Sequence, residues 1–284
     1  MRFFEYAIFP KQVRNHYAGQ LIRMNTNGSY GRIVIGLGSG RSGTASLTSL
    51  IDRQFDGICF HEMNPSCAVF SGNPQPQING VREFQEILRG GNKARLSIDY
   101  SRPSSVTTYQ KLQDMRKVSL IGDIAYYYLT YVDDLLRVAP ECRFLCIRRD
   151  RAQTIASWLK KSSITRWRSL WIADKLKSLL TQTPFHTAYN YWQEHDGSVW
   201  KQDPVWDSCF PKFKASSREE AIGMYWDYYY LEADRLQQEH PRNFRIFDVA
   251  DLSAQAGQRR ILSFIGLPED VMVCDEGVHL HKSN

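Results

Sequence analysis

Short apolar runs rich in β-branched residues alternate with longer amphipathic stretches through most of the chain. The apolar runs have the length of buried strands, and polar residues, glycines or prolines separate them. The predicted strands cover residues 33–35, 57–62, 94–100, 118–124, 143–148 and 243–247. The predicted helices cover residues 44–54, 81–89, 126–138, 151–161, 216–239 and 253–266. Residues 64–80 and 101–105 contain prolines and small polar residues, and are predicted to form a loop and a turn.

This alternation of strand and helix favours a sheet of mostly parallel strands, because parallel strands need long, usually helical connections. Continuously apolar strands indicate that both faces of the sheet are covered. The predicted fold class is therefore α/β with three layers, in which helices cover both faces of a mostly parallel central sheet. No linker rich in Pro, Gly or Ser divides the chain, so a single domain over residues 1–284 is expected.

One stretch combines a strand, a glycine-rich loop and a helix, namely residues 32–49, RIVIGLGSGRSGTASLTS. Gly38, Gly40 and Gly43 allow tight turns and leave backbone N–H groups uncovered. The helix predicted to begin near Thr44 places the positive end of its dipole at the loop. Together these features favour binding of an anion with several oxygens, such as a phosphate. A tight turn with a purely structural role is the alternative interpretation.

The loop departs from the nucleoside-triphosphatase pattern, which has Lys and then Ser or Thr after its second glycine. Here Gly43 is followed by Thr44 and Ala45, and the cation inside the loop is Arg41. The loop therefore lacks the lysine that reaches a γ-phosphate, and this weakens the case for a kinase.

Composition and charge narrow the class of protein further. The 284 residues are 43% hydrophobic and 23% charged, with a net charge of +6, which suits an anionic ligand. Lys and Arg form no long stripe, so no nucleic-acid partner is expected. The six cysteines lack zinc-ligand spacing, and several lie in apolar runs, which suits a reducing compartment. The N-terminal residues resemble neither a signal peptide nor a membrane span, so a soluble, cytoplasmic protein is expected.

Polar residues stand at the ends of several predicted strands. His61 and Glu62 follow one strand, Asp123 lies near the end of a second, and Arg148 with Arg149 ends a third. The carboxyl ends of parallel strands share one edge of a sheet, and open α/β sheets bind ligands at that edge. These residues and the glycine loop are therefore expected to converge on one site.

Three segments, in this order, resemble the sulfotransferases that use 3′-phosphoadenosine-5′-phosphosulfate (PAPS). Residues 40–44, GRSGT, look like the family's 5′-phosphosulfate loop. Residues 143–157, RFLCIRRDRAQTIAS, look like its 3′-phosphate segment, in which a serine follows an arginine by eight residues. Arg149 and Ser157 have this spacing. Residues 244–268 resemble the late strand and helix end of the family, so the resemblance covers residues 32–268.

The resemblance implies a P-loop-like α/β fold of the sulfotransferase type, with PAPS as the cofactor and adenosine 3′,5′-bisphosphate as the product. The cofactor-binding residues that it implies are Gly40, Arg41, Ser42, Gly43, Thr44, Ala45, Arg149 and Ser157. Arg148 is the neighbouring competitor of Arg149, and only one of two successive strand residues should enter the site. No metal is expected, because cations and N–H groups would hold the leaving phosphate.

The chain also departs from the family. Arg41 replaces the lysine of the cytosolic members, and Ala250 stands where Glu is usual. The Arg-Lys-Gly segment that cytosolic members carry near the C-terminus is missing. Residues 64–115 and 162–215 match nothing in the family, and residues 162–215 are expected to form an insertion on the acceptor side.

Sulfuryl transfer builds charge on the leaving phosphate, and fixed donors must stabilise that charge. Arg41 is expected to do so electrostatically, since arginine does not readily release a proton. The acceptor needs a general base, for which Glu62 is the first candidate, His61 the second and Asp123 the third. A turn hydrogen bond or an ion pair is the structural alternative for each of them.

The predicted function is transfer of a sulfuryl group from PAPS to a hydroxyl of a carbohydrate, a glycolipid or a small metabolite. A P-loop small-molecule kinase and a catalytically silent nucleotide-binding protein are the alternatives. The many aromatic residues between positions 167 and 230 fit either ordinary packing or an acceptor cleft. The sequence names neither the acceptor nor the oligomeric state.

Overall fold

The computed structural model describes residues 31–63, 72–100, 102–163, 209, 211, 213 and 215–275, with only the backbone of residues 161–163. Contacts group residues 31–284 into one compact unit and residues 1–30, which lie outside the described residues, into another. All elements below belong to the unit of residues 31–284. The single domain over residues 1–284 stays a prediction.

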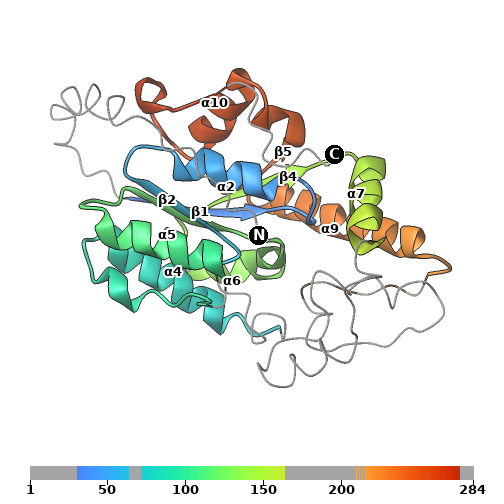
Figure 1. Ribbon diagram of the computed structural model, residues 1–284, viewed down its shortest axis with the longest axis horizontal. Helices are drawn as coiled ribbons and strands as arrows, with labels where there is room; N and C mark the ends of the chain where they lie inside the picture. Colours follow the sequence, from blue (N-terminus) through green and yellow to red (C-terminus); the bar gives the residue numbers. More distant parts are fainter. Residues whose placement is uncertain are drawn as a thin grey trace, which may run out of the picture. The chain divides into compact units, whose positions relative to one another are not determined.

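Five parallel strands form one sheet in the order β2-β3-β1-β4-β5 (Figure 1). The strands are β1 (Arg32–Leu37), β2 (Gly57–His61), β3 (Leu120–Ile124), β4 (Arg143–Arg148) and β5 (Phe244–Asp248). In the register, Ile35 of β1 stands opposite Asp123 of β3 and Phe144 of β4. The predicted α/β class is confirmed, and the sheet is parallel throughout.

Successive residues of each strand enter two separate cores. On β1, Ile33, Ile35 and Leu37 join the first core, and Val34 joins the second. The helices that close the first core are α4 (Gln75–Leu88), α5 (Pro103–Asp114), α6 (Val132–Val138), α7 (Arg151–Ser163) and α9 (Arg218–Glu239). The helices that close the second are α2 (Thr44–Asp52) and α10 (Gln255–Phe264). Helices therefore cover both faces of the sheet, as the apolar strands predicted (Figure 1).

The predicted strand at residues 94–100 is wrong. A 3₁₀ turn, η2 (Lys93–Arg95), is followed by an extended stretch that joins no ladder of the described sheet. Leu96 and Ile98 in this stretch are buried. The sequence alternates like a strand because alternate side chains enter the core, although the backbone has no strand partner.

The predicted loop and turn are also partly wrong. Helix α4 begins at Gln75, inside the predicted loop, and α5 begins at Pro103, inside the predicted turn. Both helices carry a proline, Pro76 or Pro103, in their first turn. Proline fits there because its missing N–H has no helical partner at that position. Here the prolines mark helix starts and not a loop.

Other helix boundaries agree closely with prediction. Oδ1 of Asp150 accepts the N–H of Gln153 at 2.9 Å and so caps α7. Oγ of Ser217 accepts the N–H of Glu220 at 3.1 Å, and the Glu220 carboxylate accepts the N–H of Ser216. This capping box starts α9, a helix of 22 residues. The predicted helix over residues 126–138 is divided into η3 (Tyr126–Tyr131) and α6.

The middle strand, β1, has β3 on one side and β4 on the other. The chain leaves β1 through α2 on one face of the sheet, and it leaves β3 through η3 and α6 on the other face. The two connections therefore diverge at the carboxyl end of β1. Open α/β sheets bind ligands at such a switch point. The glycine loop lies directly after β1, at this position.

Among the described residues, no helix is both long and apolar enough to cross a membrane. The described cysteines form no disulfide, and four of them are buried: Cys59, Cys142, Cys146 and Cys209. Burial raises the pKa of the Cys59 thiol well above its ordinary value. The cytoplasmic location stays a prediction.

Candidate functional site

The loop between β1 and α2 turns through left-handed backbone conformations. The φ angle is +76° at Gly40, +58° at Arg41 and +102° at Gly43. Gly43 immediately precedes Thr44, the first residue of α2. Turns of this kind direct neighbouring N–H groups into a concavity that suits an anion, and the helix start adds partial positive charge. The loop therefore has the backbone of an anion site.

Side chains would not fit at two of the loop glycines. A Cβ at Gly40 would lie 2.6 Å from Cζ2 of Trp158, and a Cβ at Gly38 would lie 2.2 Å from Oγ of Ser42. Both distances are far below van der Waals contact. At Gly40 the positive φ adds a second reason for glycine. The close packing keeps the loop backbone directly against α7 and against its own serine.

The loop contacts both residues that the resemblance assigns to a 3′-phosphate. Nε of Arg41 donates to Oγ of Ser157 at 3.0 Å. Nη1 of Arg149 donates to the backbone oxygen of Arg41 at 3.1 Å. Within the described part of the chain, neither guanidinium forms an ion pair with a carboxylate. Burial, followed by the charge of Arg149, lowers the pKa of Arg41. Two close guanidinium groups of this kind favour an anion beside them.

Arg148 takes a different direction from Arg149. Its Nη2 lies 2.6 Å from Oδ1 of Asp234 on α9, and its guanidinium lies 5.0 Å from the ring centroid of Tyr230. Successive residues at a strand end point to opposite sides. Of this adjacent pair, Arg149 is therefore the residue that reaches the loop.

His61 ends β2 and contacts the start of α2. Its Nε2 lies 3.2 Å from Oγ1 of Thr44. The hydroxyl of Thr44 belongs to the last residue of the anion loop and the first of the helix. Of the three candidate bases, His61 is the one with a hydrogen bond to the loop.

Glu62 follows in a left-handed conformation, with φ of +53°. Its Oε2 accepts a hydrogen bond from Nη2 of Arg102 at 2.6 Å, and a quarter of its side chain is exposed. Burial acts to lower the pKa of Arg102, but the Glu62 carboxylate outweighs it, so the pKa lies above its ordinary value. Arg102 belongs to the predicted turn, 40 residues away from Glu62. No sequence pattern connected the two.

Asp123 lies inside the core, with no exposed surface. Its two carboxylate oxygens accept the N–H of Met63 at 3.1 and 3.2 Å, and Oδ2 accepts the hydroxyl of Tyr128 at 2.8 Å. Burial raises its pKa from 3.8 to about 6, against the hydrogen bonds that favour the anion. The structure thus places this third candidate base where it holds the turn that carries His61 and Glu62.

Sequence reasoning missed three contacts from α9. The hydroxyl of Tyr229 accepts the N–H of Gly38 at 3.0 Å. The hydroxyl of Tyr230 lies 3.3 Å from Oγ of Ser39. Nε1 of Trp226 donates to the backbone oxygen of Arg149 at 3.1 Å. These three aromatic residues have i, i+3, i+4 spacing, which places them on one helix face and is the signal that could have indicated their common role.

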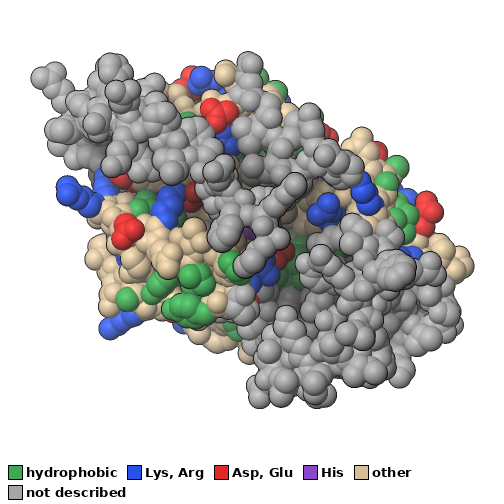
Figure 2. All heavy atoms as spheres, in the orientation of Figure 1, with side chains coloured by type: hydrophobic (Ala, Val, Ile, Leu, Met, Phe, Trp, Pro, Cys, Tyr) green, Lys and Arg blue, Asp and Glu red, His purple; other side chains and the backbone are tan. Residues whose placement is uncertain are grey.

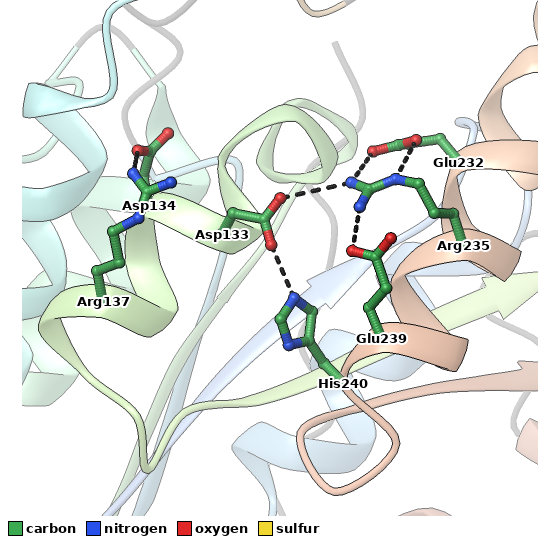
Figure 3. Close-up of polar contacts among 7 residues, drawn as sticks. All are labelled: Asp133, Asp134, Arg137, Glu232, Arg235, Glu239 and His240. Atoms are coloured by element: carbon green, nitrogen blue, oxygen red, sulfur yellow. Dashed lines mark hydrogen bonds and ion pairs between the residues drawn. The ribbon is translucent and has the colours of Figure 1, made fainter.

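One group of described side chains has the spacing of metal ligands: Asp133, Glu239 and His240, whose ligand atoms all lie within 4.8 Å of one another. Figure 3 shows Arg235 beside them, paired with Asp133, Glu239 and Glu232. Nε2 of His240 lies 2.7 Å from Oδ1 of Asp133. Because a guanidinium already neutralises these carboxylates, we interpret the group as an ionic link between α6 and α9.

The surface in Figure 2 shows Lys and Arg side chains scattered among acidic and other polar ones over its described residues. They form no continuous basic track on the described part of this face. Most of the predicted acceptor-side insertion, residues 164–208, lies outside the described residues, as do residues 64–71 and 276–284. The expected absence of a nucleic-acid partner stays a prediction.

No family model matches the chain, and no curated protein matches it. The fold is similar to that of solved sulfotransferases. One is the sulfotransferase from Alicyclobacillus acidocaldarius, with 12% identity, 84% of this chain and 82% of that chain covered, and a TM-score of 0.43. Another is the sulfotransferase domain from the curacin biosynthetic pathway, with 14% identity, 84% and 74% covered, and a TM-score of 0.36. At these values the function has to be argued from the site residues themselves.

Proposed function

We propose that this protein is a sulfotransferase that uses PAPS and transfers its sulfuryl group to a hydroxyl of a carbohydrate, a glycolipid or a small metabolite. The observation that carries this proposal is the direct contact of the anion loop with Arg149 and Ser157. A nucleotide with anionic groups on both its 5′ and its 3′ carbon needs two adjacent sets of donors. The loop amides are one set, and Arg149 with Ser157 is the other.

The donor set fits such a nucleotide by its chemistry. The N–H groups of Ser42, Gly43 and Thr44, with the Thr44 hydroxyl, would bind the 5′-phosphosulfate, between Gly40 and Ala45 at the edges of the loop. Arg149 and Ser157 would bind the 3′-phosphate through charge-assisted hydrogen bonds. Arg41 lies between the two sets, in contact with both, and would stabilise charge on the leaving phosphate.

The remaining chemistry belongs to the acceptor side. PAPS supplies the sulfuryl group, whose bond to the phosphate oxygen breaks as a bond to the acceptor oxygen forms. The acceptor proton then passes to a base. We keep Glu62 as the first candidate because its carboxylate is partly exposed. His61 is the alternative through its contact with Thr44. Asp123 has both carboxylate oxygens occupied, which favours a structural role.

The kinase alternative is weakened by the neighbours of the loop. Magnesium-dependent phosphoryl transfer uses a loop Ser or Thr and an Asp to hold the metal, and a Lys on the phosphates. Here the Thr44 hydroxyl contacts His61. Asp123, at the end of the neighbouring strand, is enclosed by hydrogen bonds from Met63 and Tyr128. Arg41 stands in place of the lysine.

Calorimetry separates these functions. Adenosine 3′,5′-bisphosphate should bind without magnesium and more tightly than ATP. Tighter binding of ATP that depends on magnesium would overturn the proposal in favour of a kinase. Incubation with sulfur-labelled PAPS and a panel of glycans and metabolites should then identify the acceptor. Tight bisphosphate binding without transfer to any acceptor would favour the catalytically silent alternative.

A further inference from the structure

We propose that one face of α9 holds the anion loop and Arg149 in register with each other, with Trp226, Tyr229 and Tyr230 as positioning residues. The inference rests on the proposed function for the identity of the ligand, and on hydrogen bonds within the described residues for the positioning itself. The three side chains reach three different segments that are far apart in the sequence.

Tyr229 joins the start of the loop to the segment after β3. It is 1% exposed. Its hydroxyl accepts the N–H of Gly38 at 3.0 Å and donates to the backbone oxygen of Tyr126 at 3.1 Å. One hydroxyl thus satisfies a backbone donor and a backbone acceptor that would otherwise lie buried without these partners. The first residue after β1 is thereby fixed relative to η3.

Tyr230 joins the next loop residue to β4. Its hydroxyl donates to the backbone oxygen of Ile147 at 2.7 Å and lies 3.3 Å from Oγ of Ser39. Ile147 is followed by Arg148 and Arg149, so the same hydroxyl fixes the strand end that delivers Arg149 to the loop. Burial raises the pKa of both tyrosines, which keeps their hydroxyls protonated and able to donate at neutral pH.

Trp226 acts on Arg149 itself. Its Nε1 donates to the backbone oxygen of Arg149 at 3.1 Å. Its ring lies 4.6 Å from the ring of Tyr230, centroid to centroid. Since Arg149 donates in turn to the backbone of Arg41, the contacts form a closed circuit from α9 through Arg149 to the loop and back through Tyr229.

The loop needs this support because of its own composition. Gly40 and Gly43 adopt left-handed conformations, and glycine loses more conformational freedom than other residues when it is ordered. Amide donors stabilise a developing charge best when they are already oriented before the anion arrives. Hydrogen bonds from a rigid helix provide that orientation at little further cost. Tyr228, on the same helix, is 45% exposed and packs against Phe213, so it serves as a matched control.

Amide hydrogen exchange of the ligand-free protein tests the loop directly. In Tyr229→Phe, exchange of peptides covering residues 38–45 should be about tenfold faster, the equivalent of one lost hydrogen bond. Tyr230→Phe should have a similar effect on the same peptides, and Tyr228→Phe should have none. Thermal melting of each variant monitors the fold. If the loop peptides of Tyr229→Phe and Tyr230→Phe exchange like those of Tyr228→Phe, the proposal is wrong.

Nucleotide binding then separates the two halves of the site. Trp226→Phe should weaken binding of adenosine 3′,5′-bisphosphate about fivefold to tenfold and leave adenosine 5′-monophosphate unaffected, because it acts through Arg149. Tyr229→Phe should weaken binding of both nucleotides. In an Arg149→Ala background, Trp226→Phe should have no further effect, and an additive loss would contradict the role of Trp226. If the wild-type protein binds neither nucleotide, the sulfotransferase proposal fails, while the exchange experiment still decides whether α9 positions the loop.

Discussion

Nη1 of Arg149 donates to the backbone oxygen of Arg41 at 3.1 Å, across 108 residues of sequence. Arg149 follows β4 and Arg41 lies in the loop after β1, and these two strands are neighbours in the sheet. The two segments that resemble the phosphosulfate loop and the 3′-phosphate segment are therefore in direct contact. A single nucleotide that carries both anionic groups is the ligand this arrangement favours.

Removal of the Arg149 side chain should abolish bisphosphate binding. Arg149→Ala deletes a charge-assisted donor set, and the expected loss of affinity for adenosine 3′,5′-bisphosphate is roughly 100-fold or more. Calorimetry measures it. Arg137→Ala is the control for loss of one positive charge, because Arg137 is exposed and paired with Asp134 away from the loop (Figure 3). Equal affinities of the two variants would remove Arg149 from the site.

Neutralisation of Glu62 should slow turnover and spare the cofactor. Glu62→Gln keeps an acceptor for Arg102 but no longer takes a proton, so kcat should fall by roughly 10² to 10⁴. Affinity for adenosine 3′,5′-bisphosphate should change by less than about twofold, because Glu62 has no described contact with the loop. Full activity of this variant would shift the base to His61, and His61→Gln would then carry the loss.

Ionisation of Asp123 should make the stability of the fold depend on pH. Its pKa is raised from 3.8 to about 6, so the folded protein holds this proton more tightly than the unfolded chain. The resulting stabilisation is fully present below about pH 4 and is lost as the pH rises through about 6. The loss amounts to about 3 kcal/mol, at about 1.4 kcal/mol for each pKa unit.

Urea unfolding of the wild type and of Asp123→Asn between pH 4 and 7 measures this term. Asparagine does not titrate, so the free energy of unfolding of the wild type minus that of the variant should fall by about 3 kcal/mol over this range. A difference that stays constant with pH would show that Asp123 does not titrate with a raised pKa.

Gln258 should contribute to stability through the C-terminal segment that it holds. It is 1% exposed. Its Nε2 donates to the backbone oxygens of Leu252 and Asp275 at 2.8 and 2.6 Å, and its Oε1 accepts the N–H of Asp275 at 2.9 Å. Gln258→Leu leaves these groups without partners and should lower the free energy of unfolding by about 2–3 kcal/mol. The exposed Gln75 provides the control, since Gln75→Leu should change it by less than about 0.5 kcal/mol.

Local patterns predicted most of the fold. The apolar runs at β1, β2, β3, β4 and β5 identified every described strand, because a strand buried on both faces has no room for polar side chains. Residues 94–100 misled for a related reason, since alternating burial does not require a strand partner. The start of α5 at Pro103 was missed because proline is common both in turns and in the first helical turn.

The amino-acid sequence by itself determined the candidate loop, because its glycines, its flanking strand and its following helix are contiguous, and it also determined the spacing of Arg149 and Ser157. Only the tertiary structure decided which side chains meet there. Burial of Asp123, the pairing of Glu62 with Arg102 and the hydrogen bonds from α9 each depend on which faces of distant elements pack together. Such contacts leave no local pattern, since each partner alone is an ordinary polar residue on a strand end or a helix.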